Sequence, residues 1–136
     1  MSLPSLDDLK ENLILLDDWE QRYHYIIELG KELPALEEQY HHDDYKIKGC
    51  ISQLWLYITR DDAGYLLMCA DSDAMIVKGL VAIIMVIYQQ KTIAQAREID
   101  ALGVFRDLGL EEHISANRRN GFQNMVNYID HYLEKF

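Results

Sequence analysis

Apolar residues recur every three or four positions at the start of the chain, which is the spacing of a helix with one buried face. Ser5 stands where an N-cap residue belongs, so a first amphipathic helix is expected to run to about Leu16. A second helix is expected from Trp19 to Gly30. The polar residues 34–44 are typical of a connecting loop.

The period changes from helical spacing to alternation after Tyr45. Residues 51–59 are rich in strand formers, with the odd-numbered residues on one face and the even-numbered residues on the other. Residues 60–64 have the composition of a turn, and residues 65–70 predict a second strand. The pair is expected to form an antiparallel hairpin.

A long apolar run follows the hairpin. Residues 71–73 (Asp-Ser-Asp) are expected to stop the sheet and cap a helix from about Ala74 to Gln90. Because that helix is apolar nearly all round, it is expected to be the buried central element. Two short helices and a last one from about Asn117 complete an α+β fold, with a small antiparallel β-sheet packed on helices. Residues 1–136 are expected to form a single domain.

Charge is distributed unevenly along the chain, whose net charge is −10. Residues 1–44 hold twelve acidic and three basic side chains. This balance argues against nucleic acid and anionic membrane surfaces as partners. A solvated helix face is the commoner meaning of such a segment, and steering of a basic partner is the alternative. The apolar run 79–88 is shorter than a membrane span, and the start of the chain lacks a secretory pattern, so a reducing, cytoplasmic location is expected.

Cys50 is the strongest candidate for a reactive group. It follows Gly49, and Lys46 and Lys48 precede it at a spacing that puts all three side chains on one side of an extended segment. Nearby ammonium groups favour the nucleophilic thiolate. A small buried hydrophobic residue is the alternative interpretation. Cys69 lies inside an apolar strand and is expected to pack in the core, although a redox pair with Cys50 across the hairpin stays open.

Other candidate groups have plainer explanations. The run 41–44 (His-His-Asp-Asp) has metal-ligand chemistry, but adjacent histidines in a polar loop favour a solvated segment, and no metal site is predicted. Residues 71–73 could contact a cation or a partner, and helix capping accounts for them. Arg118 and Arg119 stand near a helix start, where the dipole disfavours them, so they are either contacts for acidic groups or a solvated pair.

The segment 47–55, IKGCISQLW, resembles the GCxSQVW signature of the SufE family of sulfur acceptors. Three more segments resemble the same family in matching order. They are residues 19–36 with the WExRY start, residues 70–80 with ADSDAxIVKGL, and residues 118–121 with RxNG. The resemblance covers most of the chain and implies a SufE/IscU-like fold.

What the resemblance implies is a sulfur carrier of iron–sulfur cluster assembly. Cys50 would take persulfide sulfur from a cysteine desulfurase of the SufS or CsdA type, stimulate that enzyme, and deliver the sulfur to a scaffold of the SufBCD type. Pyridoxal phosphate (PLP) belongs to the desulfurase, so the chain itself needs no cofactor. Gly49 would give the loop freedom. The residues expected to support Cys50 or to dock a partner are Ser52, Gln53, Trp55, Asp71, Asp73 and Arg118.

Two other functions are weighed against the carrier. A non-catalytic adaptor would bind a desulfurase through the acidic N-terminal half. A cysteine hydrolase would need a histidine within hydrogen-bond reach of Cys50. A cluster scaffold is disfavoured because Cys50 is the only thiol expected in that loop. An edge strand or an exposed apolar loop would also support a homodimer.

Overall fold

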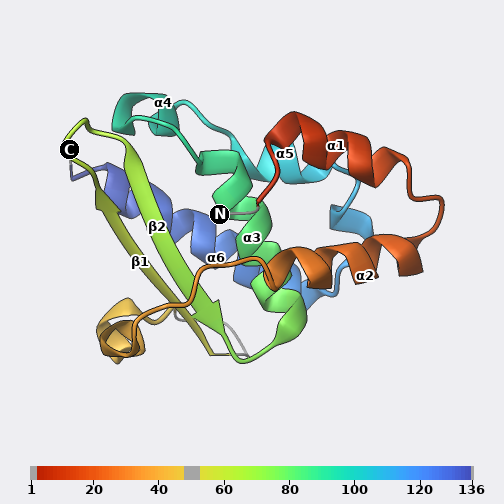
Figure 1. Cartoon of the computed structure of the whole chain (residues 1–136), viewed down its shortest axis with the longest axis horizontal. Helices are drawn as coiled ribbons and strands as arrows, with labels where there is room; N and C mark the ends of the chain where they lie inside the picture. Colours follow the sequence, from red (N-terminus) through yellow and green to blue (C-terminus); the bar gives the residue numbers. More distant parts are fainter. Residues whose placement is uncertain (1–2, 48–52, 136) are drawn as a thin grey trace.

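The computed structural model describes residues 3–47 and 53–135. Helices precede and follow a β-hairpin along the chain, which confirms the predicted α+β fold (Figure 1). The helices are α1 (Leu6–Ile14), α2 (Trp19–Gly30), α3 (Met75–Tyr88), α4 (Ile93–Arg97), α5 (Ala101–Asp107) and α6 (Ala116–Leu133). The strands are β1 (Leu54–Arg60) and β2 (Leu66–Ser72), and the 3₁₀ turns are η1 (Glu38–Tyr40), η2 (Asp43–Tyr45) and η3 (Glu111–His113).

The two strands form an antiparallel pair whose register runs from Leu54 opposite Ser72 to Arg60 opposite Leu66. The even-numbered residues of β1 from Leu54 to Ile58 are buried, and Trp55 and the other odd-numbered residues are half-buried. The predicted alternation is therefore confirmed, and the sequence pattern alone separates the two faces.

The core lies between the inner face of this hairpin and the helices. Figure 1 shows α3 at the centre, with the hairpin on one side and α1 and α2 on the other. From Gly79 to its end at Tyr88, every residue of α3 is buried, which confirms the predicted central helix. Apolar side chains on all sides of one helix require neighbours on all sides, and that requirement places α3 in the middle.

Helices α2 and α3 approach closely at two glycines. A Cβ atom built on Gly30 would lie 2.6 Å from the backbone nitrogen of Gly79. A Cβ atom on Gly79 would overlap the carbonyl oxygen of Ile26. The contact is thus backbone against backbone, and it exists because neither residue has a side chain.

The outer face of the hairpin is covered by the segment that was expected to be a plain loop. That segment contains η1 and η2, which contact β1. The ring of Tyr57 on β1 packs 4.1 Å from Tyr40 and 5.5 Å from Tyr45, measured between ring centroids. The aromatic layer therefore covers the outer face of β1, whereas Leu67 on the outer face of β2 stays exposed.

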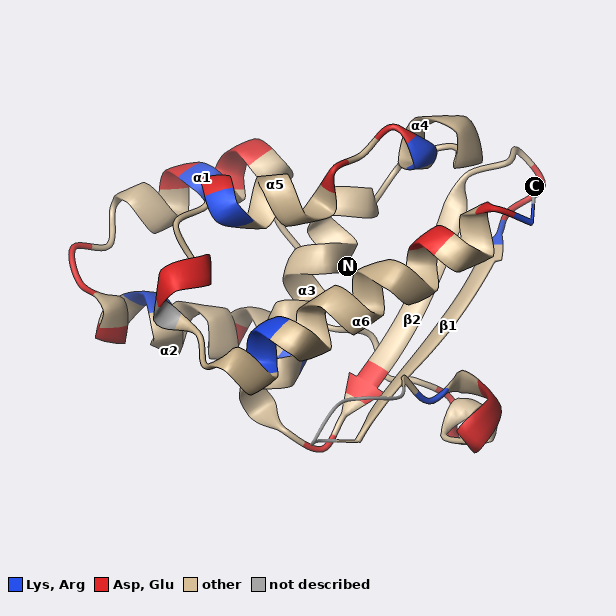
Figure 2. Ribbon diagram, turned by 180° about the vertical axis from the view of Figure 1, so that it is seen from behind, with Lys and Arg blue, Asp and Glu red and all other residues tan. Residues whose placement is uncertain are grey.

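Figure 2 shows Asp and Glu at the α1–α2 corner and also at the end of β2 and on the turns that cover the hairpin. Within residues 3–47 and 53–135, no helix is long and apolar enough to cross a membrane.

Candidate functional site

The described ends of the Cys50 segment meet at one end of the hairpin. The backbone N–H of Ile47 donates to the carbonyl of Leu54 at 2.8 Å, and Lys46 pairs with Trp55 across an isolated bridge. Gln53 leads directly into β1. Gly49, Cys50 and Ser52, which the sequence singled out, lie outside the described residues.

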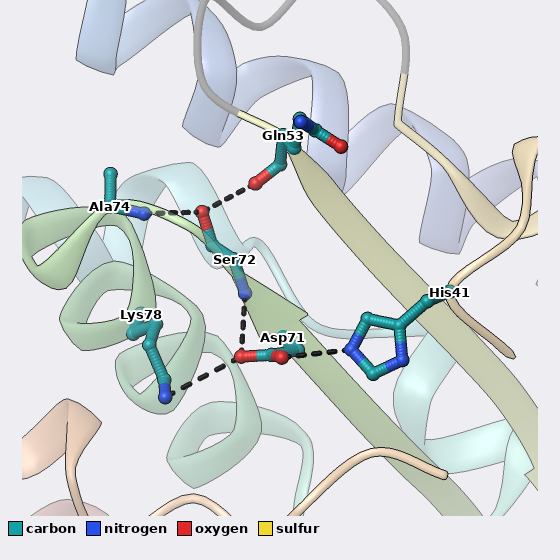
Figure 3. A network of polar contacts seen from close by, with 6 residues as sticks. All are labelled: His41, Gln53, Asp71, Ser72, Ala74 and Lys78. Carbon is teal, nitrogen blue, oxygen red and sulfur yellow. Dashed lines mark hydrogen bonds and ion pairs between the residues drawn. The ribbon is translucent and has the colours of Figure 1, made fainter. Parts of the chain in front are cut away.

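Gln53 is fixed to the end of β2 by three hydrogen bonds, of which Figure 3 draws the one with Ser72. Its backbone N–H donates to Asp73 Oδ1 at 3.0 Å, and its carbonyl accepts from the Ser72 hydroxyl. The same carbonyl accepts from the Asp73 N–H at 3.3 Å. Ser72 is buried, and its Oγ also accepts from the Ala74 N–H at 3.2 Å. These bonds hold the chain rigidly three residues after Cys50.

The predicted helix cap at residues 71–73 is wrong. Strand β2 continues through Ser72, and the N-cap of α3 is Ala74, which makes no side-chain cap. Asp73 instead accepts from Gln53, and Asp71 faces the outer side of the sheet. The sequence predicted that these side chains cap the helix that follows them. The hairpin register instead places the backbone of Gln53 within hydrogen-bond distance of Ser72 and Asp73.

Asp71 lies at the centre of a second group of polar contacts at the same end. Its Oδ2 is 2.9 Å from His41 Nε2, and its Oδ1 is 3.4 Å from Lys78 Nζ and accepts from the Ser72 N–H at 2.9 Å. The His41 ring packs edge-on against Trp55 with centroids 4.8 Å apart. His41 thereby connects the outer covering segment to the open end of the hairpin, as Figure 3 shows.

These contacts set the ionisation of Asp71. Burial raises the pKa of its carboxyl, but the hydrogen bonds from His41 and Ser72 and the nearby Lys78 ammonium outweigh burial, so the pKa lies below its ordinary value. The carboxylate therefore stabilises the fold above its unfolded-state pKa of about 3.9, and this stabilisation is lost as the pH falls through the lower folded-state pKa.

Asp71→Asn is expected to lower the free energy of unfolding by about 1–2 kcal/mol at pH 7 and to flatten its fall below about pH 4. Denaturant unfolding of both proteins between about pH 2.5 and pH 7 measures this. Asp62→Asn, in the exposed hairpin turn, is the matched control. Equal slopes for wild type and Asp71→Asn in acid would contradict the assigned role of the carboxylate.

The predicted docking residues do not all lie together. Gln53, Trp55, Asp71 and Asp73 meet at the hairpin end, as described above. Arg118 on α6 instead donates to the Tyr23 hydroxyl at 3.0 Å, with its guanidinium carbon 5.9 Å from the centre of that ring. It therefore joins α6 to α2.

The sequence did not predict that His41, Ser72 and Lys78 contribute to this site. His41 was predicted to lie in a solvated loop, Ser72 to cap a helix, and Lys78 was considered only within a family segment. No local pattern relates His41 to Asp71, thirty positions away. The strand register could have indicated that Trp55 lies opposite Asp71, because both positions follow from the hairpin turn. In the part of the chain that the structure describes, no three His, Cys, Asp or Glu residues form a group that could hold a metal ion.

Cys69 lies on the outer face of β2, opposite Tyr57, and is half-buried. The prediction that it packs in the core is therefore wrong, because the alternation puts Ala70 and not Cys69 on the inner face. Burial, and to a lesser extent the Glu37 carboxylate, raises the pKa of the Cys69 thiol. Cys69 is thus a poor source of thiolate at neutral pH.

The chain matches, over residues 7–133, the model of the SufE family, described as an Fe-S metabolism associated domain. The chain belongs to the SufE family. Two uncharacterized SufE-like proteins, from Rhizobium meliloti (strain 1021) and Rhizobium etli, are each 43% identical to it over 130 residues. These matches cover 93% of this chain and 93% and 88% of the respective relatives.

The fold is also found in a solved structure. A hypothetical protein from Thermus thermophilus superimposes with a TM-score of 0.77, covering 99% of this chain and 97% of that one, at 18% sequence identity. The predicted SufE membership and α+β fold are thus confirmed, and the protein is associated with iron–sulfur metabolism.

Proposed function

We propose that this SufE-family protein accepts sulfane sulfur on Cys50 from a cysteine desulfurase and delivers it to an iron–sulfur scaffold. The observation that carries the proposal is the segment IKGCISQLW, which holds Cys50 within a chain that matches the family over residues 7–133. The fixed attachment of Gln53 supports it, because a reactive segment needs a rigid support at its base.

The transfer is a thiol exchange. The Cys50 thiolate attacks the terminal sulfur of a persulfide on the desulfurase, and a new sulfur–sulfur bond forms as the donor's sulfur–sulfur bond breaks. The bonding electron pair leaves on the donor cysteine, which becomes a thiolate. Cys50 then carries the persulfide, and no external oxidant or reductant is consumed.

The two described carboxylates at the hairpin end are both held by polar contacts. Both carboxylates at this end already accept hydrogen bonds, Asp71 from Ser72 and Asp73 from Gln53. The Lys78 ammonium also lies 3.4 Å from Asp71. These contacts fix the end of the hairpin from which the Cys50 segment leads, and a fixed base supports the proposal.

The proposed partners follow from this chemistry. The donor is a PLP-dependent desulfurase of the SufS or CsdA type, whose turnover the carrier stimulates by removing the persulfide. The acceptor is a scaffold of the SufBCD type. The carrier uses no cofactor or metal of its own, since exchange between sulfur atoms requires only the thiolate. A reducing compartment such as the cytoplasm keeps Cys50 free for transfer.

Transfer of radioactive sulfur tests the proposal. The protein is incubated with a purified desulfurase, PLP and cysteine labelled at sulfur, and is then separated on a non-reducing gel. The proposal predicts label on this chain that dithiothreitol releases, together with faster alanine production by the desulfurase. An unlabelled chain, with desulfurases of both types, would contradict the proposal.

A further inference from the structure

Met75 is a large apolar side chain that the fold leaves in water at the start of α3. It is 57% exposed, whereas its neighbour Ile76 is 4% exposed and belongs to the core. The core beside the first turn of α3 is therefore filled without Met75. Methionine is flexible and polarisable, which suits it to contacts with the surface of another protein.

Met75 lies beside the end of the hairpin that leads to Cys50. Asp73, two residues earlier, accepts from the Gln53 N–H at 3.0 Å, and its own N–H donates to the Gln53 carbonyl at 3.3 Å. Both residues are exposed. Figure 1 shows the start of α3 next to the end of β2. Helical Cα–Cβ bonds tilt toward the helix N-terminus, so the side chain of Met75, the first residue of α3, points past the helix start.

Covalent geometry limits how far a sulfur donor can be from this surface. Cys50 precedes Gln53 by three residues, so their Cα atoms are at most about 11 Å apart. A specific interface buries about 800 Å² on each partner, which corresponds to a patch about 30 Å across. A protein that brings its persulfide sulfur to Cys50 through such an interface therefore extends over the surface around Gln53.

Charge and access decide which occupant fits this surface. A second copy of the chain would place a net charge of −10 against a net charge of −10. It would also cover the end of the hairpin from which Cys50 takes sulfur. The desulfurase, in contrast, has to come to this end for transfer to occur. An apolar side chain with polar neighbours, here Gln53 and Asp73, has the composition of a protein–protein contact with an apolar centre and a polar rim.

We propose that Met75 is an apolar contact for the cysteine desulfurase, next to the site that holds the persulfide of that enzyme. The inference rests on the proposed function, since it names the partner from which the carrier takes sulfur. Met75 contacts protein and not the reacting sulfur atoms. It therefore sets the affinity of the complex and leaves the rate of the bound complex unchanged.

Binding and turnover measurements with the purified desulfurase test the contact. Met75→Gln is expected to weaken binding about tenfold by isothermal titration calorimetry. The KM for the carrier in stimulated alanine production should rise by a similar factor, with kcat within about twofold of wild type. Glutamine has nearly the helix propensity of methionine and adds no charge, so the fold and the net charge are kept.

Ile14→Gln is the matched control. Ile14, the last residue of α1, is 75% exposed, and Figure 1 shows the end of α1 far from the start of α3. The substitution removes an exposed apolar side chain from a helix, as Met75→Gln does, and should leave affinity and KM within about twofold of wild type. Circular dichroism of both variants checks that the fold is intact.

The outcomes separate this inference from the carrier function. If wild type accepts sulfur and Met75→Gln binds the desulfurase as tightly as wild type, the Met75 contact is overturned and the carrier function stands. Equal weakening by both variants, or a lower kcat with an unchanged KM, overturns the contact as well. Unchanged desulfurase binding with impaired delivery to the scaffold, or with a changed oligomeric state, assigns Met75 to the scaffold or to a second copy instead. Wild-type protein that neither binds the desulfurase nor accepts its sulfur overturns the carrier function, and the contact with it.

Discussion

Cys50→Ser is expected to reduce sulfur acceptance to background while changing the affinity for the desulfurase by less than about twofold. A serine oxygen cannot form the sulfur–sulfur bond that stores the transferred atom, so the loss is complete and not partial. The change replaces one sulfur atom with oxygen and adds none of the bulk that would disturb docking. Labelled-sulfur transfer and calorimetry on the same preparation measure the two effects.

Cys69→Ser is the matched control for that variant. Cys69 is half-buried on the outer face of β2, and its raised pKa keeps it a thiol at neutral pH, so sulfur acceptance should stay near the wild-type level. Label retained by Cys50→Ser and lost by Cys69→Ser would move the acceptor role to the second cysteine and contradict the assignment.

Gly79→Ala is expected to cause the largest loss of stability, about 3 kcal/mol or more, and to lower Tm by about 10 °C. Alanine normally favours a helix over glycine by about 1 kcal/mol, so propensity alone predicts the opposite sign. The steric effect dominates because the added Cβ would overlap the Ile26 carbonyl oxygen, a backbone atom that cannot rotate away. Thermal unfolding measured by circular dichroism gives the result.

Gly64→Ala is the control for Gly79→Ala, because it introduces backbone strain without steric overlap. Gly64 has a φ of 87°, and a Cβ built there meets nothing within 4 Å. Gly64→Ala should therefore lower the free energy of unfolding by only about 1–2 kcal/mol, the strain of an alanine in the left-handed region. A Gly79→Ala protein as stable as wild type would mean that α2 and α3 separate easily, contrary to the close backbone contact.

Sequence patterns predicted the elements better than the contacts between them. Apolar spacing located α1 and α2 and the apolar helix α3, because each has to bury one side or all sides. Alternation located the hairpin for the same reason. The predicted N-caps Ser5 and Asp18 are confirmed, since each side chain accepts a hydrogen bond from the first turn of its helix.

The candidate site was predictable only in part. Cys50 was predicted from residue chemistry and from the family resemblance, since these are local in sequence, and it stays a prediction because it lies outside the described residues. The contacts of Asp71 and Asp73 were not predicted, because their partners His41 and Gln53 are distant in sequence and only the tertiary fold brings them together. Cys69 was misplaced because β2 carries apolar residues on both faces, and composition alone does not say which face is the core.

Peptide mass spectrometry tests the central claim most directly. The protein is incubated with a cysteine desulfurase, PLP and cysteine, and is then alkylated and digested. The account predicts an added mass of about 32 Da, one sulfur atom, on the peptide that contains Cys50 and none on the peptide that contains Cys69. An unmodified Cys50 peptide, from protein that still binds the desulfurase, would contradict the carrier function and favour the adaptor.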